Sequence, residues 1–199
     1  MQYFIRILEC YVPITCKLSS LLSLEGKEIL IRETTKAAKR TKFTLFAVQN
    51  KNDYLIVDTG FANRIVNAIL AKTESNNLFY PEQIVENYKC DFYSATSKTL
   101  IEVKSVITTE QEVLLPNMKT QRAIIQLHNI CSLLSKGYRA EYFIVAFAPQ
   151  LEKVKVASKE KVGFLLKEFL NLGGEISCIR ITLDESYNIN CDRLDYIFV

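Results

Sequence analysis

Residues 90–106, CDFYSATSKTLIEVKSV, decide the fold of this 199-residue chain. Two apolar runs flank a short polar turn, which is the pattern of a β-hairpin. If Ser94 pairs with Thr99, a four-residue loop remains, and the same register sets Asp91 opposite Glu102. The hairpin therefore brings two carboxylates together among side chains that are otherwise mostly apolar.

This carboxylate pair predicts a metal site. Directly opposite Cβ atoms lie roughly 4.5–5.5 Å apart, so ionised Asp91 and Glu102 repel each other, and partial burial increases the repulsion. A divalent cation between them removes the conflict, and hard oxygen ligands with room for water and a substrate phosphate suit Mg²⁺. Lys104 shares a face with Glu102, where its charge can stabilise a phosphate or orient a water. The pattern indicates phosphodiester hydrolysis; an ordinary hairpin with a solvated polar face is the alternative.

A long helix is predicted after the hairpin, from a cap at Asn117 to Gly137. One of its faces is apolar and is expected to pack on the sheet, whereas the other is polar and basic. A basic face beside two carboxylates suits a phosphate backbone, and a solvated helix surface is the alternative. Gln121, in its first turns, could orient a water or a base. The residues expected to contact nucleic acid are Lys119, Arg122, Lys39, Arg40 and Arg64.

Composition narrows the class of protein. Hydrophobic residues make up 49% of the chain, enough for a sizeable core, and the formal net charge of +3 requires any basic patch to be local. The sequence shows no apolar run of membrane-spanning length and no signal-peptide layout at its start. Its six cysteines are scattered without a C-x-x-C pair, which disfavours a disulfide framework or a structural zinc site. We therefore expect a cytoplasmic protein.

The order of the expected elements favours an α/β class. Strands are predicted over 27–33, 43–49, 53–58, 141–148 and 175–183, and helices over 61–72 and from Ser158 to Leu172. The polar segment 73–77 is the expected boundary between a β-rich region and a region in which strands alternate with helices. Residues 184–199 show no decisive pattern.

The hairpin and the helix that follows it resemble the core of the PD-(D/E)xK nucleases. The segments ENYKCDF, TLIEVKSV, LPNMKTQR and FIVAFAP, in this order and spacing, are similar to the sugar fermentation stimulation protein A (SfsA) family, and so are TKFTLFAV and DTGFANRIV upstream. The resemblance covers roughly residues 27–181. Its most specific part is IEVKSV followed by Pro116, Thr120 and Arg122.

The resemblance implies an α+β chain with a shortened OB-like β region in residues 1–75 and a restriction-endonuclease-like α/β domain in residues 76–199. It implies nucleic-acid binding, with DNA favoured over RNA, and a nuclease activity that depends on Mg²⁺ or Mn²⁺. Asp91 and Glu102 are implied as metal ligands and Lys104 as the catalytic lysine. Glu86 matches a family glutamate just before the first strand and is a candidate supporting residue, like Gln121.

Several positions depart from the family pattern. Ala68 stands where the family has a glutamate, so the metal would be held more weakly, or only one ion would be held, if that glutamate is a ligand. Gln121 replaces a glutamate and Gln126 a histidine, and the N-terminal region lacks the family's first strands. These departures leave open a non-catalytic DNA-binding or regulatory protein of sugar metabolism that retains the fold. A structural or interaction domain is a third hypothesis. The sequence leaves the oligomeric state open, a homodimer included.

Overall fold

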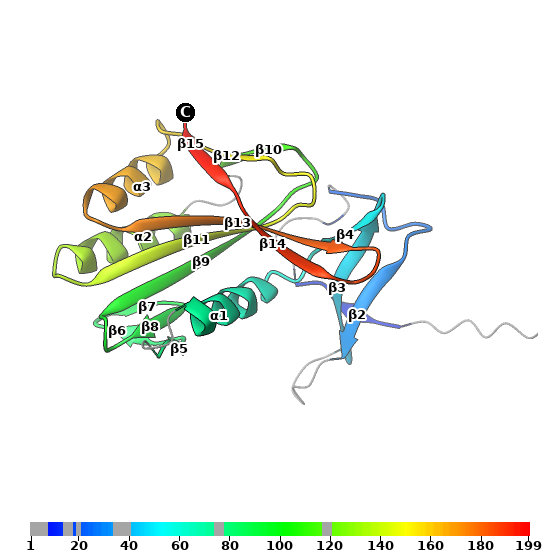
Figure 1. Ribbon diagram of the computed structural model, residues 1–199, viewed down its shortest axis with the longest axis horizontal. Helices are drawn as coiled ribbons and strands as arrows, with labels where there is room; N and C mark the ends of the chain where they lie inside the picture. Colours follow the sequence, from blue (N-terminus) through cyan, green and yellow to red (C-terminus); the bar gives the residue numbers. More distant parts are fainter. Residues whose placement is uncertain (1–7, 14–17, 19–20, 34–40, 74–77, 117–120) are drawn as a thin grey trace, which may run out of the picture.

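The computed structural model describes residues 8–13, 18, 21–33, 41–73, 78–116 and 121–199 (Figure 1). The helices are α1 (Phe61–Thr73), α2 (Gln121–Leu134) and α3 (Lys161–Asn171). The strands are β1 (Cys10–Tyr11), β2 (Ile29–Glu33), β3 (Phe43–Asn50), β4 (Asp53–Ile56), β5 (Tyr80–Pro81), β6 (Ile84–Val85), β7 (Tyr88–Lys89), β8 (Phe92–Ser94), β9 (Thr99–Ile107), β10 (Glu112–Leu115), β11 (Arg139–Phe147), β12 (Lys153–Val156), β13 (Glu175–Asp184), β14 (Ile189–Arg193) and β15 (Asp195–Phe198).

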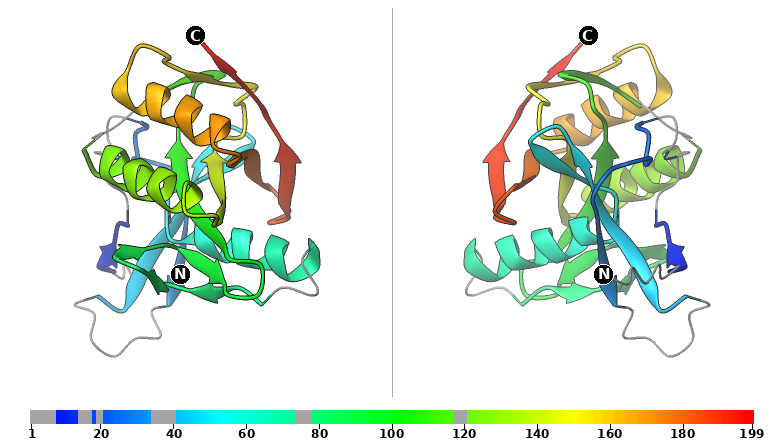
Figure 2. Two further views of the ribbon diagram at one scale, coloured as in Figure 1. Left: turned by 90° about the vertical axis from the view of Figure 1, so that its left-hand side faces the viewer. Right: turned by 90° about the vertical axis from the view of Figure 1, so that its right-hand side faces the viewer.

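Three long parallel strands form the centre of the main sheet, in the order β9, β11, β13. Parallel strands need covered faces, and β11 is accordingly apolar along most of its length. Helices α2 and α3 cover one face of this sheet, and α1 covers the other (Figure 2). The alternation of strands and helices in the sequence therefore yields a three-layer arrangement, and the mixed α/β fold class is confirmed.

Strand β9 supplies side chains to both cores. Its residues Leu100 and Val106 belong to the core under α2 and α3, whereas Ile101 belongs to the core under α1. Because side chains alternate along a strand, Glu102 and Lys104 take the α2 face between the two apolar positions. This face is where the candidate site forms.

The predicted hairpin register is confirmed. Strands β8 and β9 pair antiparallel, with Ser94 opposite Thr99 and Phe92 opposite Ile101. Asp91 directly precedes β8, so continuing the register places it opposite Glu102. On its other side, β8 pairs with β5 at the edge of the sheet.

The N-terminal strands β2, β3 and β4 form an antiparallel meander. A two-residue turn joins β3 to β4, and Lys51 adopts the left-handed backbone conformation that such a turn requires (φ 59°). Strand β4 then joins β13 of the main sheet through Tyr54 and Leu183. The division of the chain at residue 75 and the OB-like nature of this region stay predictions.

The structure corrects the predicted start of α3. The helix begins at Lys161 rather than after Ser158, and Glu160 precedes it without a side-chain capping bond. Ser158 has another role, since its backbone N–H donates to the carbonyl of Val199 at 2.7 Å. The serine therefore ties the loop before α3 to the end of the chain. The predicted cap of the earlier helix, Asn117, lies outside the described residues.

The strand over 175–183 is not the last one. After it, β14 pairs antiparallel with β13, and β15 completes a separate sheet in the order β10, β12, β15. Residues 184–199, which lack a clear sequence pattern, are therefore ordered by pairing with strands distant in the chain. In the part of the chain that the structure describes, no helix has the length and apolarity needed to cross a membrane.

Candidate active site

Asp91 is held at the point where β8 begins. Beyond Ile101, β8 no longer pairs with β9, so the Val103 N–H lacks a strand partner on that side. The Asp91 carboxylate takes this place, with Oδ2 accepting from the Val103 N–H at 2.8 Å. Its Oδ1 accepts from Nδ2 of Asn63 in α1 at 3.2 Å. A main-chain donor and a helix side chain thus fix the orientation of this carboxylate.

Glu102 is the one carboxylate of the pair that is almost fully buried, with 5% of its surface exposed. The Tyr88 hydroxyl donates to Oε2, and Nε2 of Gln126 donates to Oε1. Burial is the main cause that raises the pKa of Glu102 to about 7, and the negative charge of Asp91 raises it further. The carboxylate pair therefore carries the electrostatic conflict that the hairpin register predicted.

Two basic side chains partly offset this conflict. The charges of Arg122 on α2 and of Lys104 on β9 both act to lower the Glu102 pKa. Lys104 is half-buried on the same face as Glu102, and Arg122 is exposed in the first turn of α2. The site therefore combines two carboxylates with two basic side chains, Lys104 near the sheet and Arg122 toward solvent.

The other proposed residues lie in different places. Glu86 has a left-handed backbone conformation and pairs with Lys136 at 2.5 Å, beside a cavity of about 140 Å³ between β6–β7 and α2. Arg64 lies 3.8 Å from the buried carboxylate of Asp58, which Arg32 also contacts. Gln121 is exposed as the first residue of α2. Lys39, Arg40 and Lys119 lie outside the described residues.

The contacts of three residues were not foreseen from the sequence. Tyr88 and Gln126 bind Glu102, and Asn63 binds Asp91. Gln126 has the helical spacing of the polar face of α2, yet its amide points into the site rather than to solvent. Its place four residues after Arg122 was the available signal, because residues at that spacing share a helix face.

The donor set suits a water-rich metal site. Among the described residues, no cluster of three or more His, Cys, Asp or Glu side chains could hold a metal ion. Asp91 and Glu102 are only a pair, so waters or substrate would have to complete the coordination of an ion that they held. Mg²⁺ is usually held by one or two carboxylates, with waters and substrate phosphates completing its coordination. The two carboxylates fit this type of ion.

Comparison with known proteins places this site within a family. The family model described as "Sugar fermentation stimulation protein RE domain" matches residues 60–187. The chain belongs to this family. The matched region runs from α1 through β13 and contains Asp91, Glu102 and Lys104.

Relatives in this family match most of the chain. The sugar fermentation stimulation protein homolog of Clostridium beijerinckii is 27% identical over 200 residues, covering 94% of this chain and 86% of its own. The homolog of Thermotoga maritima is 25% identical over 175 residues, covering 85% and 77%. The solved structure of Pyrococcus furiosus SfsA in complex with Ca²⁺ superposes with a TM-score of 0.78 at 22% identity, covering 96% of this chain and 87% of that one. That likeness establishes the fold.

Proposed function

We propose that this SfsA-family protein binds nucleic acid, DNA in preference to RNA, and hydrolyses its phosphodiester bonds with a divalent cation. The observation that carries the proposal is the almost fully buried Glu102 beside the charge of Asp91; burial first, and then that charge, raise the pKa of Glu102 to about 7. Without a cation, the repulsion between two ionised carboxylates does not stabilise the protein. A cation between the carboxylates would turn the repulsion into attraction. Lys104 on the same face gives the pair a neighbour suited to phosphate chemistry.

Each residue has a part in the proposed reaction. Asp91 and Glu102 would hold Mg²⁺ or Mn²⁺; when bound, such an ion lowers the pKa of a coordinated water and neutralises charge on a phosphate. The Lys104 ammonium stabilises the negative charge that develops on the phosphate oxygens. Arg122, exposed beside them, binds the phosphate backbone and positions it. Asn63 and the Val103 N–H hold the Asp91 carboxylate in one orientation.

The Ca²⁺ in the P. furiosus relative supports a divalent cation as the cofactor. Ca²⁺ and Mg²⁺ both prefer oxygen ligands, but Ca²⁺ accepts more ligands and a looser geometry. The two-carboxylate donor set of this chain favours Mg²⁺ or Mn²⁺ as the ion that supports cleavage. Ca²⁺ is then expected to bind at the site but to support cleavage poorly.

Cleavage of labelled single- and double-stranded DNA and RNA, with Mg²⁺, Mn²⁺ or EDTA, tests the proposal. Glu102→Gln keeps the shape of the side chain but removes a ligand charge, so cleavage and metal affinity should fall together. Lys104→Ala should reduce cleavage by about a hundredfold with metal affinity nearly intact, because the lysine acts on the transition state. Lys98→Ala, a lysine at the turn of the same hairpin, is the matched control.

Two results would argue against the proposal. Cleavage that survives both site substitutions would place the active site elsewhere. An inactive wild-type protein that still binds DNA would favour the alternative of a non-catalytic DNA-binding or regulatory protein.

A further inference from the structure

A short hairpin outside the main sheet reaches the candidate site. The chain leaves the sheet at Gln83 and returns at Cys90, whose N–H donates to the Gln83 carbonyl at 3.0 Å. Between these points, β6 and β7 pair with each other and pack against the core under α2. Tyr88, in β7, is 6% exposed and donates its hydroxyl proton to Glu102. The β6–β7 hairpin therefore places the Tyr88 hydroxyl against one carboxylate oxygen of Glu102.

Helix α2 supplies the second donor. Gln126 donates from Nε2 to the other oxygen of Glu102, so each oxygen accepts one hydrogen bond from a neutral group. A carboxylate oxygen offers two lone pairs, so each oxygen retains one for a further partner. Glu102 can consequently keep both donors and contact a cation at the same time.

We propose that Tyr88 and Gln126 are positioning residues, which fix the Glu102 carboxylate in the orientation that a divalent cation requires. This inference rests on the proposed function. A glutamate loses rotamer freedom when it is ordered, and the two hydrogen bonds impose that order before the cation arrives. Loss of such a partner of a metal ligand typically weakens metal binding or activity by about 10–100-fold.

Tyr142 provides a matched control for Tyr88. It faces Glu102 across the β9–β11 pairing and is 5% exposed, so both tyrosines are buried beside the same carboxylate. Burial and the charges of Glu102 and Asp91 raise the pKa of its hydroxyl. Tyr142 nevertheless packs by its ring against Phe169 of α3. Between the described side chains of Tyr142 and Glu102 the structure shows no hydrogen bond, so removal of this hydroxyl leaves both donors in place.

Calorimetric titration with Mn²⁺ alone, without nucleic acid, tests the inference on the folded 199-residue chain. Tyr88→Phe and Gln126→Met each remove one donor with little change in shape, and each should weaken Mn²⁺ binding by about 10–100-fold. Gln126→His restores an N–H donor and should recover most of that loss. Tyr142→Phe should bind Mn²⁺ as the wild type does. On DNA, the two donor-removing variants should lower kcat and leave KM unchanged.

The outcomes separate this inference from the proposed function. Wild-type protein that neither binds Mn²⁺ nor cleaves DNA would refute the proposed function and this inference with it. Normal wild-type binding, with Tyr88→Phe and Gln126→Met equal to Tyr142→Phe, would refute the positioning roles alone. Circular dichroism monitors folding, and if Tyr88→Phe does not fold, the contrast between Gln126→Met and Gln126→His decides. Equal Mn²⁺ affinity in that pair would overturn the inference.

Discussion

At the scale of single residues, the site is a balance of charges at Glu102. Burial and Asp91 oppose ionisation of its carboxylate, and the Tyr88 hydrogen bond, Arg122 and Lys104 favour it. The opposing contributions leave a pKa of about 7, well above the ordinary value of 4.5. A proton occupies Glu102 for part of the time at neutral pH when no cation is present.

This balance predicts how stability depends on pH without metal. The unfolded chain releases the Glu102 proton near pH 4.5 and the folded chain near pH 7, so the folded state binds more protons between these values. The Glu102 contribution to the free energy of unfolding should therefore fall as pH rises through this window, by an amount on the order of 3 kcal/mol. Glu102→Gln should remove that fall.

Urea unfolding at several pH values in EDTA measures this effect. The wild type minus Glu102→Gln difference isolates the contribution of this one carboxylate from the other titrating groups. A difference that stays constant between pH 4.5 and pH 8 would show that Glu102 ionises in the folded protein as it does in the unfolded chain.

At the scale of elements, the hairpin and the helices could be predicted where local patterns dominate. Alternating polarity and the length of the turn define the pairing of Ser94 with Thr99, because a slip of one residue would turn the apolar side chains away from their cores. Strand β11 could also be predicted from the sequence, because a short, continuous apolar run flanked by polar residues is typical of a buried strand.

Other features depend on contacts between segments that are distant in the sequence. The start of α3 was missed because the bond from Ser158 to Val199 involves the far end of the chain. Tyr88 contacts Glu102 because the β6–β7 hairpin places it there. Strands of two residues are too short to show a periodic pattern in the sequence, so this hairpin was not predicted. The paired carboxylates were accessible to sequence reasoning. The Tyr88 donor was not, and the only sequence signal for Gln126 was its helical spacing from Arg122.

Helix α1 contains the position, Ala68, at which the SfsA family has a glutamate. Asn63 reaches Asp91 from α1, whereas Ala68 is exposed and lies five residues on, about 140° around the helix axis from Asn63. The family resemblance predicts weaker metal binding, or a single bound ion, if that glutamate is a ligand. The position of Ala68 on α1 points instead to a side chain directed away from Asp91 and Glu102.

Restoring the glutamate tests this assignment of faces. Ala68→Glu should leave Mn²⁺ affinity at physiological ionic strength unchanged, because its carboxylate would project into solvent, where salt screens it. Asn63→Ala, measured beside it, should weaken Mn²⁺ binding by about tenfold, because Asp91 loses its helix donor. Tighter binding by Ala68→Glu would show that α1 presents a further ligand to the site.

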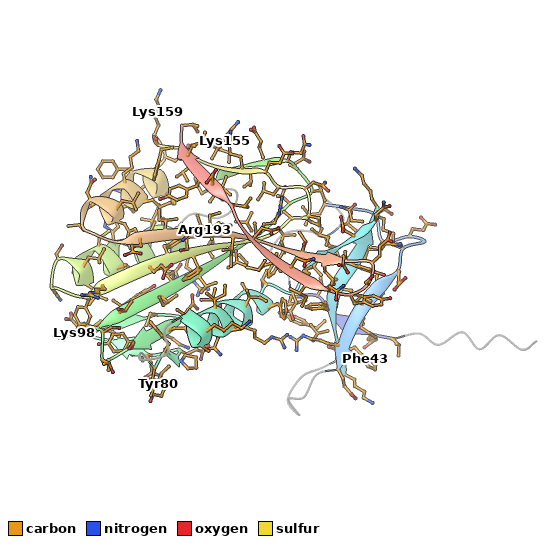
Figure 3. The ribbon with its side chains drawn as sticks, in the orientation of Figure 1. Phe43, Tyr80, Lys98, Lys155, Lys159 and Arg193 are labelled. Carbon is orange, nitrogen blue, oxygen red and sulfur yellow. The ribbon has the colours of Figure 1, made fainter. Side chains whose placement is uncertain are left out.

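At the scale of the whole molecule, the charge distribution matters more than the net charge. The chain has a formal net charge of only +3, so the proposed attraction to nucleic acid would depend on local groups. Arg122 is such a group, exposed at the start of α2 beside the carboxylates. Lys159 is an exposed lysine of another segment, the loop before α3 beside the carboxyl terminus (Figure 3).

This distribution predicts the salt dependence of DNA binding. Affinity should fall steeply with added salt, because each phosphate contact releases counterions. Arg122→Ala should weaken binding and reduce the slope of log affinity against log salt by about one. Lys159→Ala removes the same charge from the loop before α3 and should leave the slope unchanged. Fluorescence anisotropy of labelled DNA in EDTA measures both variants, and equal slopes for the two would exclude the start of α2 as a contact surface.

The central claim is that Asp91 and Glu102 together hold a divalent cation. A crystal of the protein soaked in Mn²⁺ tests it most directly, because Mn²⁺ gives an anomalous signal that locates the ion without reference to activity. We predict an anomalous peak in contact with carboxylate oxygens of both Asp91 and Glu102, absent from a Glu102→Gln crystal soaked in the same way. No peak between these carboxylates at a Mn²⁺ concentration that supports cleavage, or a peak only elsewhere, would show that Asp91 and Glu102 do not hold the cation.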